Sequence, residues 1–317
     1  MTSAKPARTQ DAKPPAGDGA DAAAVLRERE IAVEQAQVDR AYGELDRQLA
    51  AARSALAATE AAGAAGTHQS RGERDAYAVH YSDIISCLEG VEDRLVFGRM
   101  DTRSGGRHYV GRTGLQDASR REVVLDWRAP LARAFYQGTA LDPMGLVRRR
   151  HIDSRARAVV GLEDELLDAS ELGTGGGGLS VQGLQGEGAL LAAMSAARDG
   201  RMGDIVATIQ AEQDRVVTSD GRGVLVVQGG PGTGKTAVAL HRVAYLFYAE
   251  RERLERSGVL LVGPSRTFLR YVEQVLPSLG ENGVVSTTLA DLVPGVRARG
   301  SESPAVAELK GRALWAR

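Results

Sequence analysis

The sequence has little cysteine, few aromatic residues, no long apolar run and almost no net charge. Its single cysteine, Cys87, cannot form a disulfide within the chain, which is typical of a reducing compartment. No apolar run approaches the roughly 20 residues of a membrane span. No signal peptide is visible behind Lys5 and Arg8. We therefore expect a cytoplasmic protein without a membrane partner.

The balance of charge and apolar residues sets further bounds. A net charge of −1 gives no overall attraction to nucleic acid or membranes, so any basic surface must be local. Aromatic residues make up only 4% of the chain, and we expect cores built mainly from Ala, Val and Leu. With 317 residues, of which 43% are hydrophobic, the chain is long enough for about two domains.

The N-terminal third is predicted to be helical after a disordered tail over residues 1–20. Over residues 21–62, apolar residues recur every seven positions, and Gly63 to Gly72 then interrupt a helical composition that resumes to about Leu95. This pattern favours an antiparallel coiled-coil hairpin over residues 21–100, with two helices packed on the main domain as the alternative. Charged residues such as Glu34 are expected on its outer faces. The two heptad rows are Ile31, Val38, Leu45 and Ala52, and Gln35, Tyr42, Leu49 and Leu56, with Gln35 as the polar exception.

Residues 101–170 are predicted to form a small β-rich module. Gly and Asp punctuate short runs with strand composition. Within it lies the basic cluster of residues 148–151, which we interpret as a solvated strand edge, with a contact to phosphate or to an acidic protein face as the alternative. The predicted strands cover residues 107–110, 122–126, 132–136, 146–151 and 156–160.

A Gly-rich segment, residues 171–188, separates this module from an α/β pattern over residues 189–317. The segment has neither a preceding strand nor a following helix, which a phosphate loop would require, and we interpret it as a flexible linker. Strands then alternate with helices, which predicts a parallel sheet with ligands at the carboxyl ends of its strands. The predicted helices are 189–198, 204–217, 235–250, 267–276 and 289–292, and the predicted strands are 224–228, 259–262 and 284–287.

One motif carries specific chemistry. The chain matches the phosphate-loop pattern G-x-x-x-x-G-K-[ST] with an apolar run before it and a helical run after it. Such glycines let successive backbone N–H groups point at phosphates, beside the positive end of the helix dipole. We expect Lys235 to contact the β- and γ-phosphates of ATP and Thr236 to place its hydroxyl on Mg²⁺. The binding residues are Gly229, Gly230, Pro231, Gly232, Thr233, Gly234, Lys235 and Thr236.

Gln213 is a further candidate for nucleotide binding. It lies one short segment before the run that leads into the phosphate loop. An amide side chain can form two hydrogen bonds with the N6 and N7 edge of adenine. A single glutamine on a helix is more often simply solvated, so its position is what makes it a candidate.

Several ordered motifs resemble those of superfamily 1 helicases. Gln213, the phosphate loop, GPS at residues 263–265 and STTL at residues 286–289 are similar to the Gln motif and to motifs I, Ia and Ib of that superfamily. The resemblance is closer to the HelD group and its HelR variant, helicase-like ATPases of bacteria. It rests on VLDWRAP at residues 124–130, RRRHI at residues 148–152, and VQGGPGTGKT at residues 227–236 running on to LHR at residues 240–242.

This resemblance implies a fold and a function. The fold would be a partial RecA-like P-loop domain, preceded by the helical hairpin and the β-rich module. The function would be an ATP-binding motor that binds the RNA polymerase core and frees it from nucleic acid, with only indirect or transient contact to the nucleic acid itself. The resemblance also links HelR-type proteins to displacement of rifamycin antibiotics from the polymerase. The hairpin would enter a channel of that enzyme.

The departure from the family pattern leaves alternatives open. None of the 81 residues after Thr236 (317 minus 236) forms four apolar residues followed by an Asp-Glu pair, and no second RecA-like domain follows. We therefore expect an N-terminal portion or a truncated form that hydrolyses ATP poorly alone. One alternative is a superfamily 1 DNA helicase or translocase, which has no evident use for a long helical hairpin. The other is a non-catalytic protein that only binds RNA polymerase.

Overall fold

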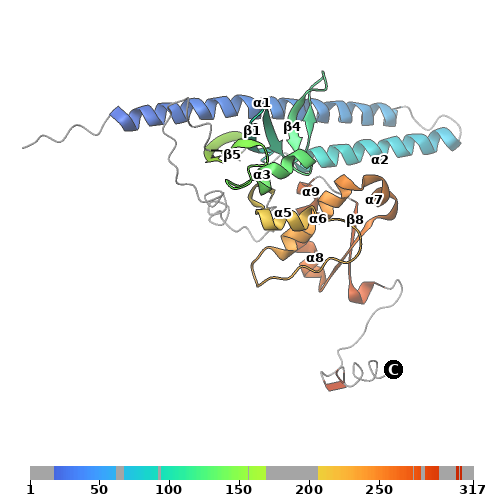
Figure 1. Cartoon of the computed structure of the whole chain (residues 1–317). Helices are drawn as coiled ribbons and strands as arrows, with labels where there is room; N and C mark the ends of the chain where they lie inside the picture. The colour runs from blue at the N-terminus through green and yellow to red at the C-terminus, as the bar shows by residue number, and fades with distance from the viewer. Residues whose placement is uncertain are drawn as a thin grey trace, which may run out of the picture.

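The computed structural model divides the chain into helices, a mixed sheet and an α/β part (Figure 1). The predicted tail before residue 18, the Gly-rich linker and the predicted helix 189–198 lie outside the described residues. No helix within the described part of the chain is both long and apolar enough to cross a membrane. The structure describes residues 18–61, 68–91, 94–155, 157–168, 206–273, 275–279, 283–292, 305, 306 and 308.

Two long helices run antiparallel at the N-terminal side of the molecule. Helix α1 (Asp18–Ala61) has 44 residues, which corresponds to about 66 Å at 1.5 Å per residue. Helix α2 (His68–Gly90) returns along its second half, and Arg53 of α1 pairs with Glu89 of α2 at 2.6 Å. Figure 1 shows both helices continuing past the edge of the sheet. We call α1 and α2 together the helical arm.

The six-stranded sheet is mixed and is built around a strand that the sequence patterns did not identify. Strand β1 (Val96–Thr102) pairs with both β2 and β5, although the sequence suggested that a helix continued to residue 95. All pairs are antiparallel except β2 with β4. We call residues 94–168 the β module. The order is β3 (Leu115–Gln116), β4 (Glu122–Asp126), β2 (Arg107–Gly111), β1, β5 (Leu146–Arg155) and β6 (Ala158–Leu166).

The heptad rows of α1 face this sheet over much of their length. Val38, Tyr42 and Leu45 are buried in one cluster with residues of the sheet, such as Ile152. Gln35, the polar exception, accepts a hydrogen bond from the backbone N–H of Val159 at 2.7 Å and donates one to the carbonyl of residue 157 at 2.9 Å. In the stretch from Gln35 to Leu45, α1 therefore packs on the sheet, as in the alternative prediction of helices packed on the main domain.

The basic cluster of residues 148–151 is not a solvated edge, and Glu34 is not on an outer face. Strand β5 lies inside the sheet, so successive side chains alternate between two covered faces. Arg150 faces α1 and donates to Glu34 at 2.8 Å, and Arg99 of β1 also donates to Glu34. Arg149 faces the other way and pairs with Glu165 at 2.5 Å. The arginines neutralise acidic groups of the chain itself.

The predicted strand 132–136 is wrong. Pro130 starts a 3-10 turn (Pro130–Ala132) that continues into helix α3 (Arg133–Gln137). The segment was predicted as a strand from its local composition, but proline at the first position of a helical turn costs no hydrogen bond and fixes a helical φ. Ala134, Phe135 and Tyr136 are all buried, because α3 lies between the sheet and the segment that contains Val206 and Ile209.

The α/β part, residues 206–292, is called here the P-loop module. Its long helix and its two paired strands agree with the sequence prediction, whereas helix 204–217 is broken after a 3-10 turn and helix 267–276 is split in two. Strands β7 and β8 pair in parallel. The elements are η3 (Val206–Thr208), α5 (Ala211–Val217), α6 (Lys235–Ala249), α7 (Arg251–Ser257), β7 (Val259–Gly263), α8 (Arg266–Val272), α9 (Val275–Ser278), β8 (Val284–Thr288) and η4 (Leu289–Asp291).

His151 makes the stability of the β module sensitive to acid. Burial, together with the charge of Arg149, lowers the pKa of His151 from 6.5 to about 4, and its ring lies 5.0 Å from that of Phe135. Unfolding lets the ring take a proton below pH 6.5, so the free energy of unfolding should fall between pH 6.5 and 4, by up to about 3 kcal/mol. In urea titrations across this range, His151→Gln should show a flatter profile than His108→Gln. Equal slopes for the two variants would contradict this role.

Candidate functional site

The phosphate loop has the backbone shape that its sequence predicts. Gly232 and Gly234 have φ values of +78° and +82°, a region that residues with a Cβ atom rarely occupy. Gly234 is the N-cap of α6, so the loop ends at the N-terminus of a 15-residue helix. The first backbone N–H groups of such a helix have no partner inside it and face the loop. This arrangement binds anions.

Lys235 and Thr236 lie together at the start of α6. The Lys235 ammonium donates to the carbonyls of Gly229 and Gly230 at 2.8 and 2.5 Å, so it lies across the mouth of the loop. Both residues line a cavity of about 340 Å³, which also includes Phe268 and Tyr271 of α8. Lys235 is the only lysine within the described ranges, in a chain that otherwise uses arginine there. Because an ammonium is more compact than a guanidinium, this choice fits a phosphate site.

Gln213 lies against the loop, where the nucleotide interpretation requires it. Its Nε2 lies 3.4 Å from the carbonyl of Thr233, and a Cβ atom added to Gly234 would lie 3.1 Å from the same nitrogen. Its Oε1 accepts the N–H of Gln210 at 3.2 Å, the N-cap of α5. The structure thus brings all the predicted site residues into one place.

The residues before the loop differ from the prediction. The segment 224–228 was expected to be a strand, but it pairs with no strand in the described part of the chain. Val224 is 94% exposed and Val226 is 74% exposed. An apolar run of this kind normally lies inside a parallel sheet covered on both faces. Local composition suggested a strand, but it does not show whether a neighbouring strand is present.

The helix that starts at the phosphate loop packs directly on the β module. His241 of α6 is fully buried, and its ring meets that of Trp127 edge to face at 5.7 Å. The guanidinium of Arg128 lies 5.1 Å from the ring centre of Tyr248. Arg133 of α3 donates to the hydroxyl of Tyr245 at 2.7 Å. The VLDWRAP segment therefore contacts helix α6, a role that its sequence alone did not suggest.

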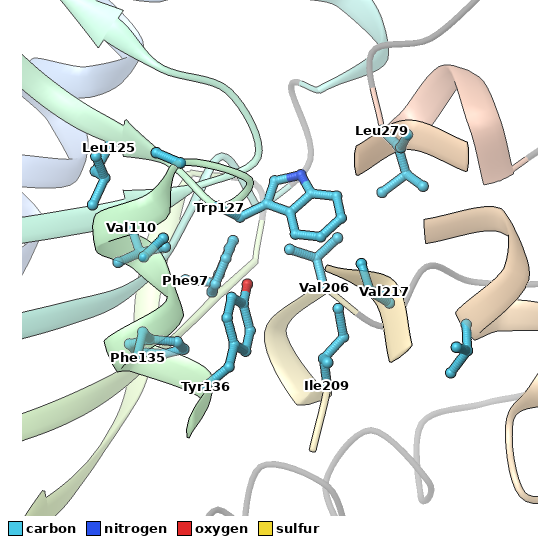
Figure 2. Packing of buried hydrophobic residues seen from close by; sticks show 14 of the residues in the cluster. Phe97, Val110, Leu125, Trp127, Phe135, Tyr136, Val206, Ile209, Val217 and Leu279 are labelled. Carbon is cyan, nitrogen blue, oxygen red and sulfur yellow. The ribbon is translucent and has the colours of Figure 1, made fainter. Parts of the chain in front are cut away.

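One apolar core joins the two modules. Phe97, Trp127 and Tyr136 belong to the same cluster as Val206 and Ile209, which precede α5. Figure 2 shows the Trp127 and Tyr136 rings facing these aliphatic residues across the boundary. Residues of the β module and of the P-loop module thus share one continuous core.

A second cavity, with a volume of about 620 Å³, lies between α8 and the carboxyl end of β8, and its lining includes Glu273 and Asp291. Arg266 and Arg270 of α8 line it, together with Ser286, Thr287 and Thr288 of β8. Arg266 also pairs with Asp291 at 2.9 Å. Within the described residues, no group of three or more His, Cys, Asp or Glu side chains is placed to hold a metal ion.

Comparisons with known proteins match two parts of the chain. Residues 31–177, which include the β module and most of α1, match the family model described as DNA helicase IV HelD, N-terminal domain. Residues 209–263, from the start of α5 to the end of β7, match the UvrD/REP helicase N-terminal domain. None of the curated proteins compared with the chain matches it. Residues 31–177 are therefore of the HelD type, and residues 209–263 are of the related UvrD/REP superfamily 1 helicase type.

Proposed function

We propose that this protein is part of an ATP-dependent motor that binds bacterial RNA polymerase and releases it from nucleic acid. The observation that carries the proposal is that the phosphate-loop helix and the helical arm both pack on the same β module. A phosphate loop begins α6, and α6 packs on the module that carries the helical arm. Such a motor needs a site that binds nucleotide, here the phosphate loop, and an extended element that reaches into its partner, here the helical arm.

The nucleotide half of the proposal rests on the loop residues. Gly232 and Gly234 shape the loop, Lys235 supplies the cation, and the hydroxyl of Thr236 suits Mg²⁺ held between protein and phosphates. Hydrolysis of Mg²⁺-ATP would supply the free energy that drives the release of polymerase. The helicase domain matched by residues 209–263 belongs to an ATPase family, which supports ATP as the ligand. Displacement of rifamycin from the polymerase would be a further consequence of polymerase binding.

The polymerase half rests on the helical arm. Beyond Gln48, whose amide lies 3.4 Å from the carbonyl of Gln116, α1 runs on for 13 residues (49–61), about 20 Å. This part pairs with α2 and is suited to enter a channel. Glu60, Glu73 and Asp75 lie toward its tip, and Glu60 and Glu73 are exposed or half-exposed. The HelD group to which the N-terminal match belongs is associated with RNA polymerase, which supports this partner.

Shortening the arm should remove most polymerase binding. Removal of residues 22–95 would expose the sheet, because Val38, Tyr42 and Leu45 cover it. A better variant replaces residues 58–83 with a short Gly-Ser linker. The Arg53–Glu89 pair shows which residues of the two helices lie opposite each other, so both cut ends lie at the same level of the arm. The linker needs to span only the roughly 10 Å between packed helices. We expect at least a tenfold loss of RNA polymerase core in a pull-down at moderate salt.

The matched control removes residues 2–17, which precede α1. This variant should bind polymerase as the unaltered chain does. Urea unfolding of the shortened variant should stay cooperative, because the sheet remains covered. Retention of polymerase by the shortened variant would show that the contact lies elsewhere.

DNA translocation is a second candidate, favoured by the 620 Å³ cavity. Its two arginines and three hydroxyl residues are groups that contact nucleic-acid phosphates. Binding of a single-stranded oligonucleotide that weakens steeply with salt, and is lost in Arg270→Ala, would favour this function over polymerase release. A third outcome, polymerase binding without any nucleotide binding, would indicate a non-catalytic partner of polymerase.

A further inference from the structure

Helix α5 connects the β module to the nucleotide site through two neighbouring side chains. Gln213 faces the phosphate loop, and Asp214 faces α3 of the β module. Residues next to each other on a helix point about 100° apart, so one short helix can contact both bodies. The position of Gln213 therefore depends on what holds Asp214.

Asp214 is held by a side chain of the β module. It is only 2% exposed, and Gln137, the last residue of α3, donates to its carboxylate from Nε2 at 2.6 Å. Burial raises the pKa of Asp214, while the Gln137 hydrogen bond and the charge of Arg133 act in the opposite direction. A buried carboxyl that loses its donor pays the full desolvation cost, so this contact defines where α5 can lie.

Helix α5 cannot hold this position by itself. It has seven residues, fewer than an isolated helix needs to be stable in water. Apolar contacts of Val217 fix the depth of α5 in the core, and Arg242 of α6 donates hydrogen bonds to the carbonyls of Val216 and Val217 at its C-terminal end. The Gln137–Asp214 hydrogen bond is directional and acts on the residue next to Gln213, so it fixes the rotation of this part of α5 about the helix axis. That rotation decides whether the Gln213 amide meets the loop.

We propose that Gln137 of the β module is a positioning residue for the nucleotide site, acting through Asp214 to hold the Gln213 amide against the phosphate loop. The proposal rests on the proposed function, because it takes adenine nucleotide as the ligand of that loop. Gln137 itself touches neither the loop nor the ligand site. Its effect is confined to the adenine end, because Lys235 and Thr236 belong to α6 and are held by separate contacts, such as Trp127 with His241.

The test compares three ligands in the whole chain with Mg²⁺: ATP, GTP and inorganic tripolyphosphate. Gln137→Ala should weaken ATP binding about fivefold, reduce the preference for ATP over GTP, and leave tripolyphosphate affinity unchanged. Gln116→Ala, an exposed glutamine of the same module, is the matched control and should change none of the three. Unchanged tripolyphosphate affinity also shows that the variant is folded.

A double-mutant cycle separates positioning from general destabilisation. If Gln137 acts through Gln213, the variant with both glutamines replaced by alanine should bind ATP no more weakly than Gln213→Ala alone. Asp214→Asn, whose amide oxygen still accepts from Gln137, should keep most of the affinity. Additive losses, or wild-type ATP binding by Gln137→Ala, would overturn the proposal. If ATP binding by the unaltered chain does not depend on Lys235, the proposed nucleotide site fails instead.

Discussion

Replacement of Glu34 by alanine is expected to lower the free energy of unfolding by about 3–5 kcal/mol, the range for removing one partner of a buried ion pair. Glu34 is fully buried on α1 and accepts hydrogen bonds from Arg99 of β1 and Arg150 of β5, each about 3% exposed. Without Glu34, both guanidiniums stay buried beside fewer acidic groups. Asp101 and Asp164 remain as partners, which keeps the loss below that of an isolated buried charge.

Urea unfolding measures this loss, and the same helix offers a matched control. Glu28 is exposed on α1, so Glu28→Ala should change the free energy of unfolding by less than about 0.5 kcal/mol. Glu34→Gln keeps the shape and one acceptor and should lie between the two. An unfolding midpoint for Glu34→Ala equal to that of Glu28→Ala would show that the ion cluster does not hold α1 on the sheet.

The position of Glu34 shows why the sequence could predict helix α1 but not what it packs against. The heptad rows of α1 repeat at the period of any amphipathic helix, and α2 and a sheet both accept such a face. Three arginines in a row suggested a solvated edge, because the sequence does not show which acidic residues face them: Glu165 is 16 residues from Arg149, whereas Glu34 is 116 residues from Arg150. Only the order of the strands brings these charges together.

The shape of the phosphate loop was predictable for the opposite reason. The phosphate loop is local: its glycines, its lysine and the helix that follows are contiguous, so spacing alone fixes their geometry. Gln213 is only 20 residues from its contact at Thr233. By contrast, Gln137 lies 77 residues before Asp214, and no local pattern connects them. Strand β1 was missed because Arg99 and Asp101 interrupt its apolar residues with charges that are buried only after folding.

Replacement of Lys235 by alanine is expected to weaken binding of Mg²⁺-ATP by about 100-fold or more. An ammonium that bonds to phosphate oxygens contributes charge-assisted hydrogen bonds of about 1.5–3 kcal/mol each, and 2.7 kcal/mol corresponds to 100-fold in affinity. The same substitution should abolish ATP hydrolysis in a form of the protein that hydrolyses ATP, because Lys235 is the cation expected on the β- and γ-phosphates. Polymerase binding should persist, since the helical arm does not contain this residue.

Lys235→Ala should leave the fold intact, which makes the loss of binding interpretable. The ammonium contacts only carbonyls of its own loop, those of Gly229 and Gly230, and these can turn to water when it is removed. The matched control is Arg253→Ala, which removes one positive charge from the exposed surface of α7 and breaks only its pair with Glu250. Calorimetric titration with Mg²⁺-ATP should show wild-type affinity for the control and no measurable heat for Lys235→Ala. Similar affinities for the two variants would mean that ATP binds elsewhere. The phosphate loop would then be a turn without its expected ligand, and the motor function would lose its energy source.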